Sequence, residues 1–524
     1  MNEAKKKCVA TALSILFAMS VITTNVYAAS DNTPPGDPPG GSMMGEPPGD
    51  PPDGNPPGNP PDGNGMGEMP GGGSTSVSYT GASTIDSSAT KSDAAYTSTT
   101  GGENALLVSG GESTLTNVTV TKSGDESGES ADFYGTNAAI LVYNGATLNM
   151  EGGSVTTNGA HANGVFACGT GTVNISDATI NTTANNSGGI MVTGGGTLNA
   201  VNLTVETQGN SSAAIRSDRG GGTLTVDGGS YTTNGQGSPA IYSTAAVTVN
   251  NAQLTSTSSE GVVVEGANSV TLNNTVLTDT NHTLNGQSET YKNIFLYQSM
   301  SGDASEGTSY FTASNSTITT NKGDTFYITN TSSIITLTNN VITNNDSTGA
   351  LLRAEAAAWG NSGSNGGKVL FDLIHQTAEG DIVVDSISEL SMELTEGSTY
   401  KGAVNSANQG GNVSLTLDDT STVVLTGDSY VSALYNDVSD NSNIYLNGYT
   451  LYVDGTAVSA NEGTAPEVTA DANAGADSAS QAVNDGDSGN CTLVVVIAGI
   501  AVLLAAAGCA VCFIAKGRKE KAAK

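Results

Sequence analysis

Six side chains that could form a binding surface recur about 21 to 26 residues apart between residues 141 and 263. They are mostly apolar or aromatic, and one is an arginine: Leu141, Phe166, Met191, Arg216, Tyr242 and Val263. An exposed stripe of this kind is typical of a binding face. The alternative is that a long insertion, residues 279–310, folds over the stripe and makes it part of the core. With the neighbouring Asp218, these residues are the candidate ligand-binding set.

A second group of interest is an acidic loop just before this stretch. Its carboxylates could supply oxygen ligands to Ca²⁺, but their spacing matches no fixed calcium-loop signature. A solvated run of charge is the better interpretation. The four acidic residues are Asp125, Glu126, Glu129 and Asp132. We expect no other cofactor, because His161, His282 and His375 lack the spacing of metal ligands.

The stripe belongs to a repeat with a pitch near 25 residues that contains three short apolar runs per period, separated by turns rich in Gly, Asn and Ser. Three strands per repeat predict an all-β solenoid in which each coil packs on the next. We call the three sets of inward-facing residues lanes one, two and three. Lane one is Ile140, Val165, Ile190, Ile215, Ile241 and Val262; lane two is Leu148, Val173, Leu198, Leu224, Val247 and Val270; lane three is Val155, Ile180, Val205, Tyr231, Leu254 and Leu277. Because strand residues alternate between the two faces, the stripe is the outward neighbour of lane one.

Composition and charge narrow the classes of partner. The formal net charge is −33, and many of the 17 basic residues lie at the two ends of the chain. Binding of nucleic acid requires clustered Lys and Arg, so we expect no nucleic-acid partner. Cys168 is the only cysteine within the predicted solenoid, which therefore has no internal disulfide.

The order of segments predicts a surface protein. Residues 1–28 are typical of a secretory signal peptide, 29–73 of a Pro/Gly-rich disordered arm and 459–490 of an acidic flexible linker. The apolar residues 491–515 are long enough for one C-terminal transmembrane helix. Because the tail, 516–524, is basic, we expect it to be cytoplasmic and the solenoid, 74–458, to be extracellular.

Three phrases strengthen the solenoid prediction: WGNSGSNGG at residues 359–367, EGDIVVDSISEL at 379–390, and TLDDTSTVVLTGDSYVS with NIYLNGYTLYVDG between 416 and 455. With the coil pattern, they resemble surface-anchored, adhesin-like proteins of Gram-positive bacteria that have the pectin-lyase-like fold. The resemblance implies a right-handed parallel β-helix, a cell-membrane location and partners that are carbohydrates or host or cell-surface proteins.

From these observations we expect a non-enzymatic, adhesin-like protein that binds a glycan or cell-surface ligand along a lateral face. The alternative is a carbohydrate-active enzyme of the same fold, either a polysaccharide lyase or a glycoside hydrolase. A lyase would need Arg216 as a base together with clustered carboxylates that hold Ca²⁺ over an acidic sugar. Such a cluster is not visible around Asp218, so fold analogy alone supports an enzyme.

Overall fold

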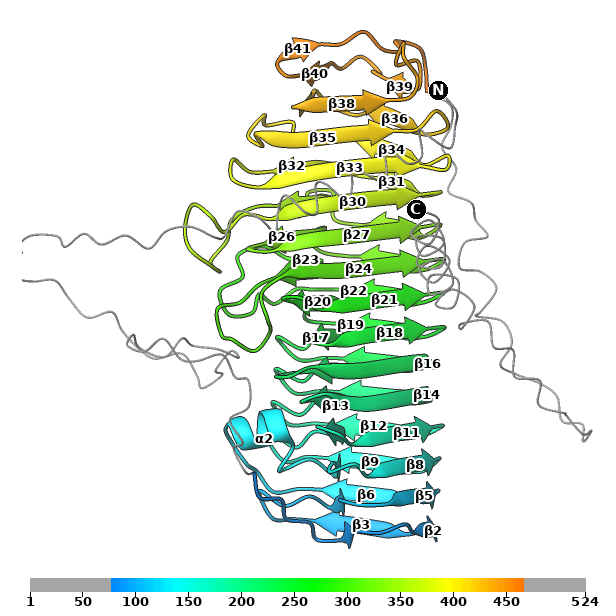
Figure 1. Cartoon of the computed structure of the whole chain (residues 1–524), viewed down its shortest axis with the longest axis vertical. Helices are drawn as coiled ribbons and strands as arrows, with labels where there is room; N and C mark the ends of the chain where they lie inside the picture. Colours follow the sequence, from blue (N-terminus) through cyan, green and yellow to red (C-terminus); the bar gives the residue numbers. More distant parts are fainter. Residues whose placement is uncertain (1–76, 466–524) are drawn as a thin grey trace, which may run out of the picture. The chain divides into compact units, whose positions relative to one another are not determined.

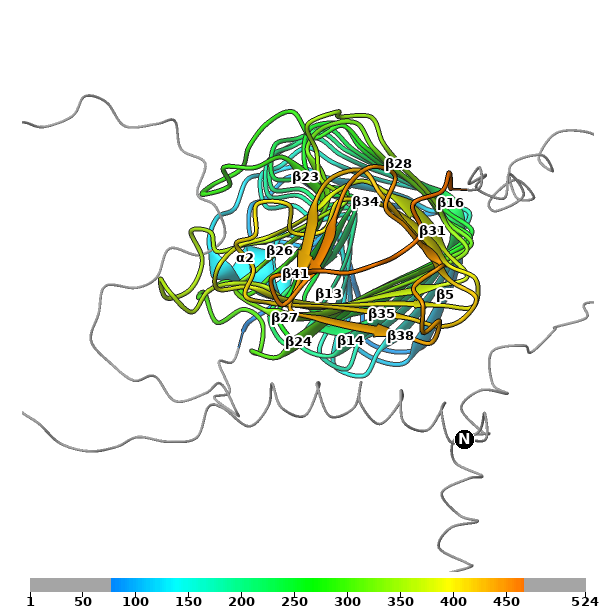
Figure 2. The same ribbon diagram turned by 90° about the horizontal axis from the view of Figure 1, so that it is seen from above.

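The computed structural model describes residues 77–465. These residues form a right-handed all-β solenoid of about 15 turns (Figure 1). Seen along the rod, each coil has three sides (Figure 2).

Lane one forms a 12-stranded parallel sheet. Its strands are β1 (Thr84–Ile85), β4 (Leu106–Val108), β7 (Ile140–Val142), β10 (Val165–Cys168), β13 (Ile190–Thr193), β15 (Ile215–Ser217), β17 (Ile241–Ser243), β20 (Val262–Glu265), β23 (Lys292–Tyr297), β26 (Asp324–Thr329), β29 (Leu352–Ala354) and β32 (Ile382–Val384).

Lanes two and three together form a 22-stranded sheet, because β14 (Gly196–Thr207) and β16 (Gly222–Thr233) run through both lanes. Its other strands are β2 (Thr90–Ser92), β3 (Ala95–Ser98), β5 (Glu112–Thr116), β6 (Thr119–Lys122), β8 (Thr147–Glu151), β9 (Ser154–Thr157), β11 (Thr172–Ser176), β12 (Thr179–Thr182), β18 (Ala246–Asn250), β19 (Gln253–Ser256), β21 (Ser269–Asn273), β22 (Val276–Asp279), β24 (Thr308–Ser314), β25 (Thr317–Thr320), β27 (Ser332–Thr338), β28 (Val341–Asn344), β30 (Lys368–Ile374), β33 (Glu389–Thr395), β35 (Asn412–Leu417) and β38 (Ala433–Asn436).

Two small sheets complete the C-terminal coils, and one short helix, α2 (Glu129–Tyr134), lies on the side of the rod. The small sheets are β31 (Thr377–Glu379), β34 (Thr399–Gly402), β36 (Thr422–Leu425) and β39 (Ile444–Tyr445), and then β37 (Ser429–Val431), β40 (Leu451–Val453) and β41 (Thr456–Ala457). All ladders among these described strands are parallel except the β40–β41 pair.

The three predicted lanes are confirmed residue by residue. In lane one, Val165 pairs with Ile140 on one side and Ile190 on the other. In lane two Leu198 pairs with Leu224, and in the same ladder Val205 of lane three pairs with Tyr231. The inward residues of all three lanes are almost fully buried and form one continuous core. Because β14 and β16 run through both lanes, the step from one coil to the next is the same for Leu198 to Leu224 as for Val205 to Tyr231.

The recurring Asn and Gly residues have a conformational cause. The turn between lanes two and three places at least one residue in the left-handed region in successive coils, with φ of 53° at Asn117, 67° at Gly152 and 52° at Asn202. Gly and Asn adopt this region at low cost, whereas β-branched residues do not. Stacked turns also share side-chain hydrogen bonds, such as Asn202 Nδ2 to Asp177 Oδ1 at 2.7 Å.

A ladder of small polar residues ends lane three on the inner side of each coil. Thr157, Thr182, Thr207, Thr233 and Ser256 are completely buried. The hydroxyls of Thr182 and Thr207 satisfy backbone groups at the turn, each donating at 2.5 Å to a carbonyl oxygen. The hydroxyls of Thr157 and Thr233 have no partner. The next residue of the ladder is Asp279, which pairs with Ser256 below and Thr320 above.

Several predicted segments lie outside the described residues: the signal peptide, the Pro/Gly-rich arm, the transmembrane helix, the basic tail and most of the acidic linker. Within residues 77–465 no helix has both the length and the apolar character needed to cross a membrane.

Candidate functional site

The stripe beside lane one is in register along the rod, but most of it is not exposed. Phe166 pairs with Leu141 and Met191, and all three side chains are completely buried. The ladder continues from Val263 to Phe295, beyond the residues that the repeat had indicated. The N-terminal half of the stripe is therefore covered and not exposed.

The cover over this half is α2 and its flanking turn, not residues 279–310. Phe133 of α2 is buried, and its carbonyl oxygen accepts a hydrogen bond from Thr193 Oγ1 at 2.8 Å. The helix ends at Gly135, whose φ of 72° is left-handed and whose missing Cβ leaves room for the Phe166 ring. Leu141, Phe166 and Met191 thus pack in a small second core and cannot contact a ligand, which corrects their assignment as binding residues.

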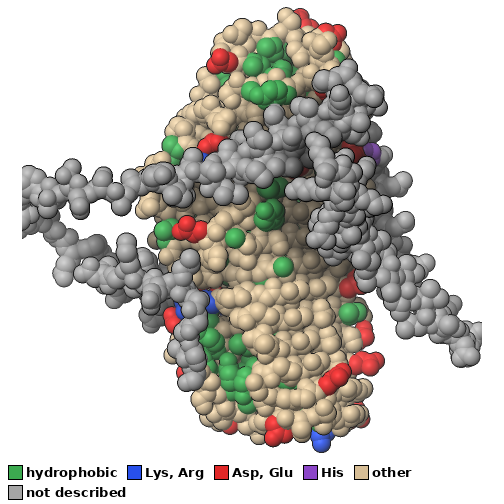
Figure 3. Space-filling view, in the orientation of Figure 1, with side chains coloured by type: hydrophobic (Ala, Val, Ile, Leu, Met, Phe, Trp, Pro, Cys, Tyr) green, Lys and Arg blue, Asp and Glu red, His purple; other side chains and the backbone are tan. Residues whose placement is uncertain are grey.

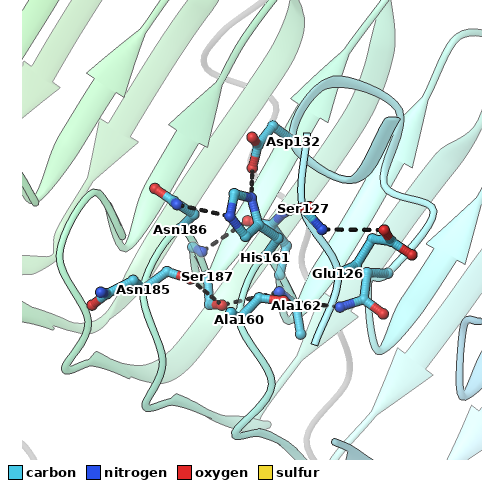
Figure 4. Close-up of polar contacts among 12 residues, drawn as sticks. Glu126, Ser127, Asp132, Ala160, His161, Ala162, Asn185, Asn186 and Ser187 are labelled. Atoms are coloured by element: carbon cyan, nitrogen blue, oxygen red, sulfur yellow. Dashed lines mark hydrogen bonds and ion pairs between the residues drawn. The ribbon is translucent and has the colours of Figure 1, made fainter. Parts of the chain in front are cut away.

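The acidic loop holds this cover in place (Figure 4). Asp132 of α2 lies 2.6 Å from His161 Nδ1, and Asn186 Nδ2 lies 3.0 Å from His161 Nε2. Arg219 forms a second clamp, because it pairs with Glu129 at 3.2 Å and lies 3.9 Å above the Phe133 ring. These contacts explain why short α2, which has little apolar surface of its own, stays on the rod.

The carboxylates that could have held Ca²⁺ make hydrogen bonds and ion pairs within the protein instead. Asp125 Oδ1 accepts a hydrogen bond from the backbone N–H of Ala160 at 2.8 Å, and Glu126 Oε1 accepts one from that of Ser127. Over residues 77–465 no three His, Cys, Asp or Glu side chains come together as a metal site would require. The interpretation of Asp125, Glu126, Glu129 and Asp132 as a calcium site is therefore not supported, and the last two are better described as anchors of α2.

A cluster of aromatic side chains covers the C-terminal part of the stripe. Phe295 stacks on Tyr297 with ring centroids 4.4 Å apart, and Tyr327 packs edge-on at 5.7 Å. Trp359 reaches this cluster from the loop that follows β29, 5.3 Å from Phe295 and 5.4 Å from Tyr297. α2 and the longer loops extend from the same side of the rod in both views (Figures 1 and 2).

Between the two covers the stripe lines an open pocket of about 90 Å³. Arg216, Tyr242 and Val263 form its floor along three successive coils. Its walls include Glu260, Phe295, Trp359 and, from the long insertion, Asn285 and Ser288. Residues 279–310 therefore border the pocket through Asn285 and Ser288, and they also contribute Phe295 and Tyr297 of β23 to the aromatic cluster. This short part of the stripe lines the pocket.

Arg216 is the most unusual group in the pocket. The residue is 8% exposed, and its Nη2 donates to Asp218 Oδ2 at 3.0 Å. Burial raises the pKa of Asp218 to about 6, against the opposing effect of the Arg216 charge. The other terminal nitrogen, Nη1, is buried without a hydrogen-bond partner. A buried guanidinium N–H that lacks an acceptor costs free energy unless a ligand or water supplies one.

A buried carboxylate orients two of the pocket's tyrosines. Glu265 accepts hydrogen bonds from the hydroxyls of Tyr242 and Tyr297 and from Ser299 Oγ. Burial raises the pKa of Glu265, and these hydrogen bonds oppose the shift. Burial also raises the pKa of both tyrosines well above its ordinary value, so their hydroxyls remain protonated donors. The hydrogen bonds to Glu265 therefore fix the orientation of the Tyr242 and Tyr297 rings.

Of the residues that line this pocket, the predicted stripe had included Arg216, Tyr242 and Val263, with Asp218 beside them, but it missed Glu260, Phe295, Tyr297 and Trp359. A signal existed for Phe295, because it is the next outward residue of lane one. The long insertion interrupts the 25-residue pitch at that point and hid the relation. Trp359 lies in an irregular loop, so no periodicity could have placed it.

The face of the rod drawn in Figure 3 is mainly uncharged and polar, with scattered acidic side chains and few basic ones. The adjacent carboxylates Asp418 and Asp419 are not among the residues that line the pocket. Asp418 accepts hydrogen bonds from the backbone and side chain of Thr420, which gives it a role in its own turn.

Comparison with protein families supports the fold. Residues 240–378 match the model of a family described as "Right handed beta helix region". That match includes the coils that contribute Tyr242, Glu260, Phe295 and Trp359 to the pocket. Comparisons with curated proteins and with solved structures find no match. Over residues 240–378 the chain is thus similar to right-handed β-helix proteins, a fold that occurs in both enzymes and non-enzymes.

Proposed function

We propose that this protein is a non-enzymatic, adhesin-like binding protein that holds a carbohydrate in the pocket on its lane-one face. The observation that carries the proposal is the combination, in one open pocket, of aromatic rings with polar side chains, among them the largely buried Arg216. Ligand pockets are typically lined by apolar and aromatic groups with a few well-placed polar ones.

The polar groups around the pocket suit a ligand with many hydroxyls. Asn285 and Ser288 supply amide and hydroxyl groups on one wall, and Glu260 supplies a carboxylate. Tyr242, Phe295 and Trp359 supply ring surface against which the apolar face of a sugar can lie. The hydrogen bonds to Glu265 hold Tyr242 and Tyr297 before any ligand arrives, which reduces the entropic cost of binding.

The same geometry favours binding over glycoside hydrolysis. Retaining and inverting hydrolases generally use two carboxyl groups that flank the scissile bond. Of the residues that line this pocket, Glu260 is the only carboxylate, and its Oε2 already accepts a hydrogen bond from Ser259 Oγ at 2.6 Å. Arg216 is paired with Asp218, so it is also a poor base for a lyase reaction.

We also propose that the protein is anchored at the cell surface. The support comes from the sequence: a signal-peptide pattern at residues 1–28 and an apolar segment at 491–515 followed by a basic tail. A lateral pocket on an extracellular rod would be accessible to glycans of another cell, of a host or of the surrounding wall.

The test is a glycan array probed with the full chain, followed by titration of the strongest hit. Trp359→Ala should weaken binding about tenfold, or ~1.4 kcal/mol, and leave the circular dichroism of the β-helix unchanged. Tyr435→Ala is the matched control, because Tyr435 is a 52% exposed aromatic residue outside the pocket. Equal binding by Trp359→Ala and the unchanged protein would refute the assignment of the pocket. Release of new reducing ends or unsaturated sugars from a bound glycan would favour the enzyme alternative.

A further inference from the structure

We propose that α2 acts as a lid whose docking on the rod controls how firmly the tyrosines of the pocket are held. Arg219 is the junction between the lid and the pocket. This inference goes beyond the proposed function, because it describes communication within the chain and holds whatever the pocket binds. It follows from a series of contacts that runs from α2 to the pocket, and from the weak attachment of α2 itself.

The attachment of α2 is weak enough for the helix to leave the rod while the coils stay folded. The helix has six residues, its N-cap Gly128 makes no side-chain hydrogen bond, and only Ala131 and Phe133 are buried. Isolated helices of this length are not stable in water. The Glu129 side chain is 71% exposed, so its ion pair with Arg219 contributes little to stability. The remaining attachment consists of individual polar contacts. Docked and undocked α2 are therefore two states that a small change in free energy can shift.

Arg219 joins α2 to the loop at residues 298–307. Its Nη1 pairs with Glu129 Oε1 at 3.2 Å, and its guanidinium lies over the Phe133 ring. Its Nε donates to Asp303, whose side chain is only 4% exposed. A carboxylate as buried as that of Asp303 depends on its cation, because an uncompensated buried charge is costly. When α2 leaves, Arg219 loses Glu129 and Phe133 as partners that orient its side chain, so the contact with Asp303 weakens as well.

Two serine hydroxyls connect Asp303 to the pocket. The backbone N–H of Asp303 donates to Ser301 Oγ at 3.2 Å, and the hydroxyl oxygens of Ser301 and Ser299 lie 2.7 Å apart. Ser299 Oγ donates in turn to Glu265. Glu265 is the carboxylate that accepts hydrogen bonds from the two pocket tyrosines. A shift of residues 299–303 therefore weakens a hydrogen bond to Glu265 and loosens both tyrosine rings.

A second path reaches the floor of the pocket through Asp218. Its Oδ1 accepts a hydrogen bond from the backbone N–H of Arg219 at 3.0 Å, and its Oδ2 accepts one from Arg216 Nη2 at 3.0 Å. Arg216 lines the pocket and pairs in the lane-one ladder with Met191, a member of the small core beneath α2. Both paths therefore begin at Arg219, from which a change at α2 reaches the floor of the pocket and its aromatic wall.

The single tryptophan of the chain reports on the far end of these paths. Trp359 lines the pocket and packs 5.4 Å from Tyr297. In lane one, β13 contacts α2 through Thr193, whereas Trp359 packs on β23 through Phe295. These two strands are four steps apart in the sheet, which is roughly 19 Å at ~4.8 Å per coil. A change in Trp359 fluorescence that follows a substitution in α2 must therefore be transmitted through the protein.

The experiment changes one end of the network and measures the other in the full chain. Glu129→Gln and Phe133→Ala should each speed hydrogen exchange in α2 severalfold, the second more strongly because it removes a buried ring. Each should also shift the Trp359 emission to longer wavelength and increase its quenching by acrylamide. The amides of Ser301 and Asp303, which donate to the serine hydroxyls, should exchange faster in the same variants.

The reverse measurement tests reciprocity. Ser299→Ala, which removes the hydroxyl that contacts Glu265, should speed hydrogen exchange in residues 129–134, because coupling between two sites acts in both directions. Glu379→Gln is the matched control. The Glu379 side chain is 65% exposed and pairs with Lys401, but it lies in a different sheet from lane one. This control should change neither exchange in α2 nor the fluorescence of Trp359.

Faster exchange in α2 with unchanged Trp359 fluorescence would overturn the coupling. Unchanged exchange in α2 in both helix variants would show that α2 is not a lid, and would overturn the proposal as well. If a variant loses the circular dichroism of the β-helix, the unchanged protein decides, because NaCl screens the exposed Arg219–Glu129 pair. Added salt should then increase exchange in α2 and quenching of Trp359 together, and an increase in only one of them refutes the coupling. None of these measurements uses a ligand, so their outcome is independent of the glycan array.

Discussion

The buried carboxyl group of Asp279 allows a quantitative test of how the β-helix interior shifts a pKa. It is completely buried in the small-polar ladder between Ser256 and Thr320, both of which carry hydroxyl groups. Neither carboxylate oxygen has a hydrogen-bond partner of normal geometry. Burial raises the pKa of Asp279 to about 9, with a further contribution from Glu260, and only the backbone N–H of Asn281 opposes the shift. The folded protein therefore keeps a proton on Asp279 at neutral pH.

The sign and size of the effect follow from linkage. The unfolded chain loses this proton near the ordinary pKa of 3.8, whereas the folded protein keeps it up to about 9. Because the folded pKa is the higher one, the free energy of unfolding decreases as pH rises between these values. One proton corresponds to about 1.4 kcal/mol per pH unit, or roughly 2.7 kcal/mol between pH 5 and 7. Asp279→Asn has no such proton, so its stability relative to the unchanged protein should increase by this amount over the same interval.

Urea denaturation followed by circular dichroism at pH 5, 6 and 7 measures this difference directly. Asp279→Thr, which restores the side-chain type of its neighbour Thr320, should show the same change with pH. Asp86→Asn, at an exposed position, is the control and should leave the pH dependence unaltered. A stability difference between Asp279→Asn and the unchanged protein that is constant from pH 5 to 7 would refute the buried, protonated state.

The remaining predictions concern the cover formed by α2. Phe166→Ala should lower the free energy of unfolding by about 3 to 5 kcal/mol, because it empties a fully buried site; a loss below 1 kcal/mol in urea titration would contradict that packing. Gly135→Ala should lower the thermal midpoint, since φ is 72° and the new Cβ would lie 2.8 Å from the Phe166 ring; an unchanged midpoint would argue against the left-handed turn. Arg219→Gln removes contacts to Glu129, Asp303 and the Phe133 ring, and should speed hydrogen exchange in residues 129–134 severalfold without unfolding the coils; unchanged exchange there would show that the clamp is unnecessary.

The sequence alone determined the solenoid and its register. In stacked parallel coils each inward residue lies above its equivalent one repeat earlier, so the spacing of Val165, Ile190 and Ile215 defines which residues pair. The need for left-handed turn residues adds Asn and Gly at the same period. These signals are local and repeated, and for that reason a single sequence contains them in full.

Only the tertiary structure decided which part of the stripe is accessible. The periodicity is the same for Phe166, under α2, and for Tyr242, in the pocket, so it cannot distinguish them. Two irregular segments make the difference, α2 and the loop that carries Trp359. They are held against the coils by individual contacts, such as those of Asp132 with His161 and of Trp359 with Phe295. Such contacts join residues at no regular separation, and they depend on the three-dimensional position of each loop. The repeat therefore predicts which residues lie on the outer face of the β-helix. The non-repeating segments determine which part of that face is accessible to a ligand.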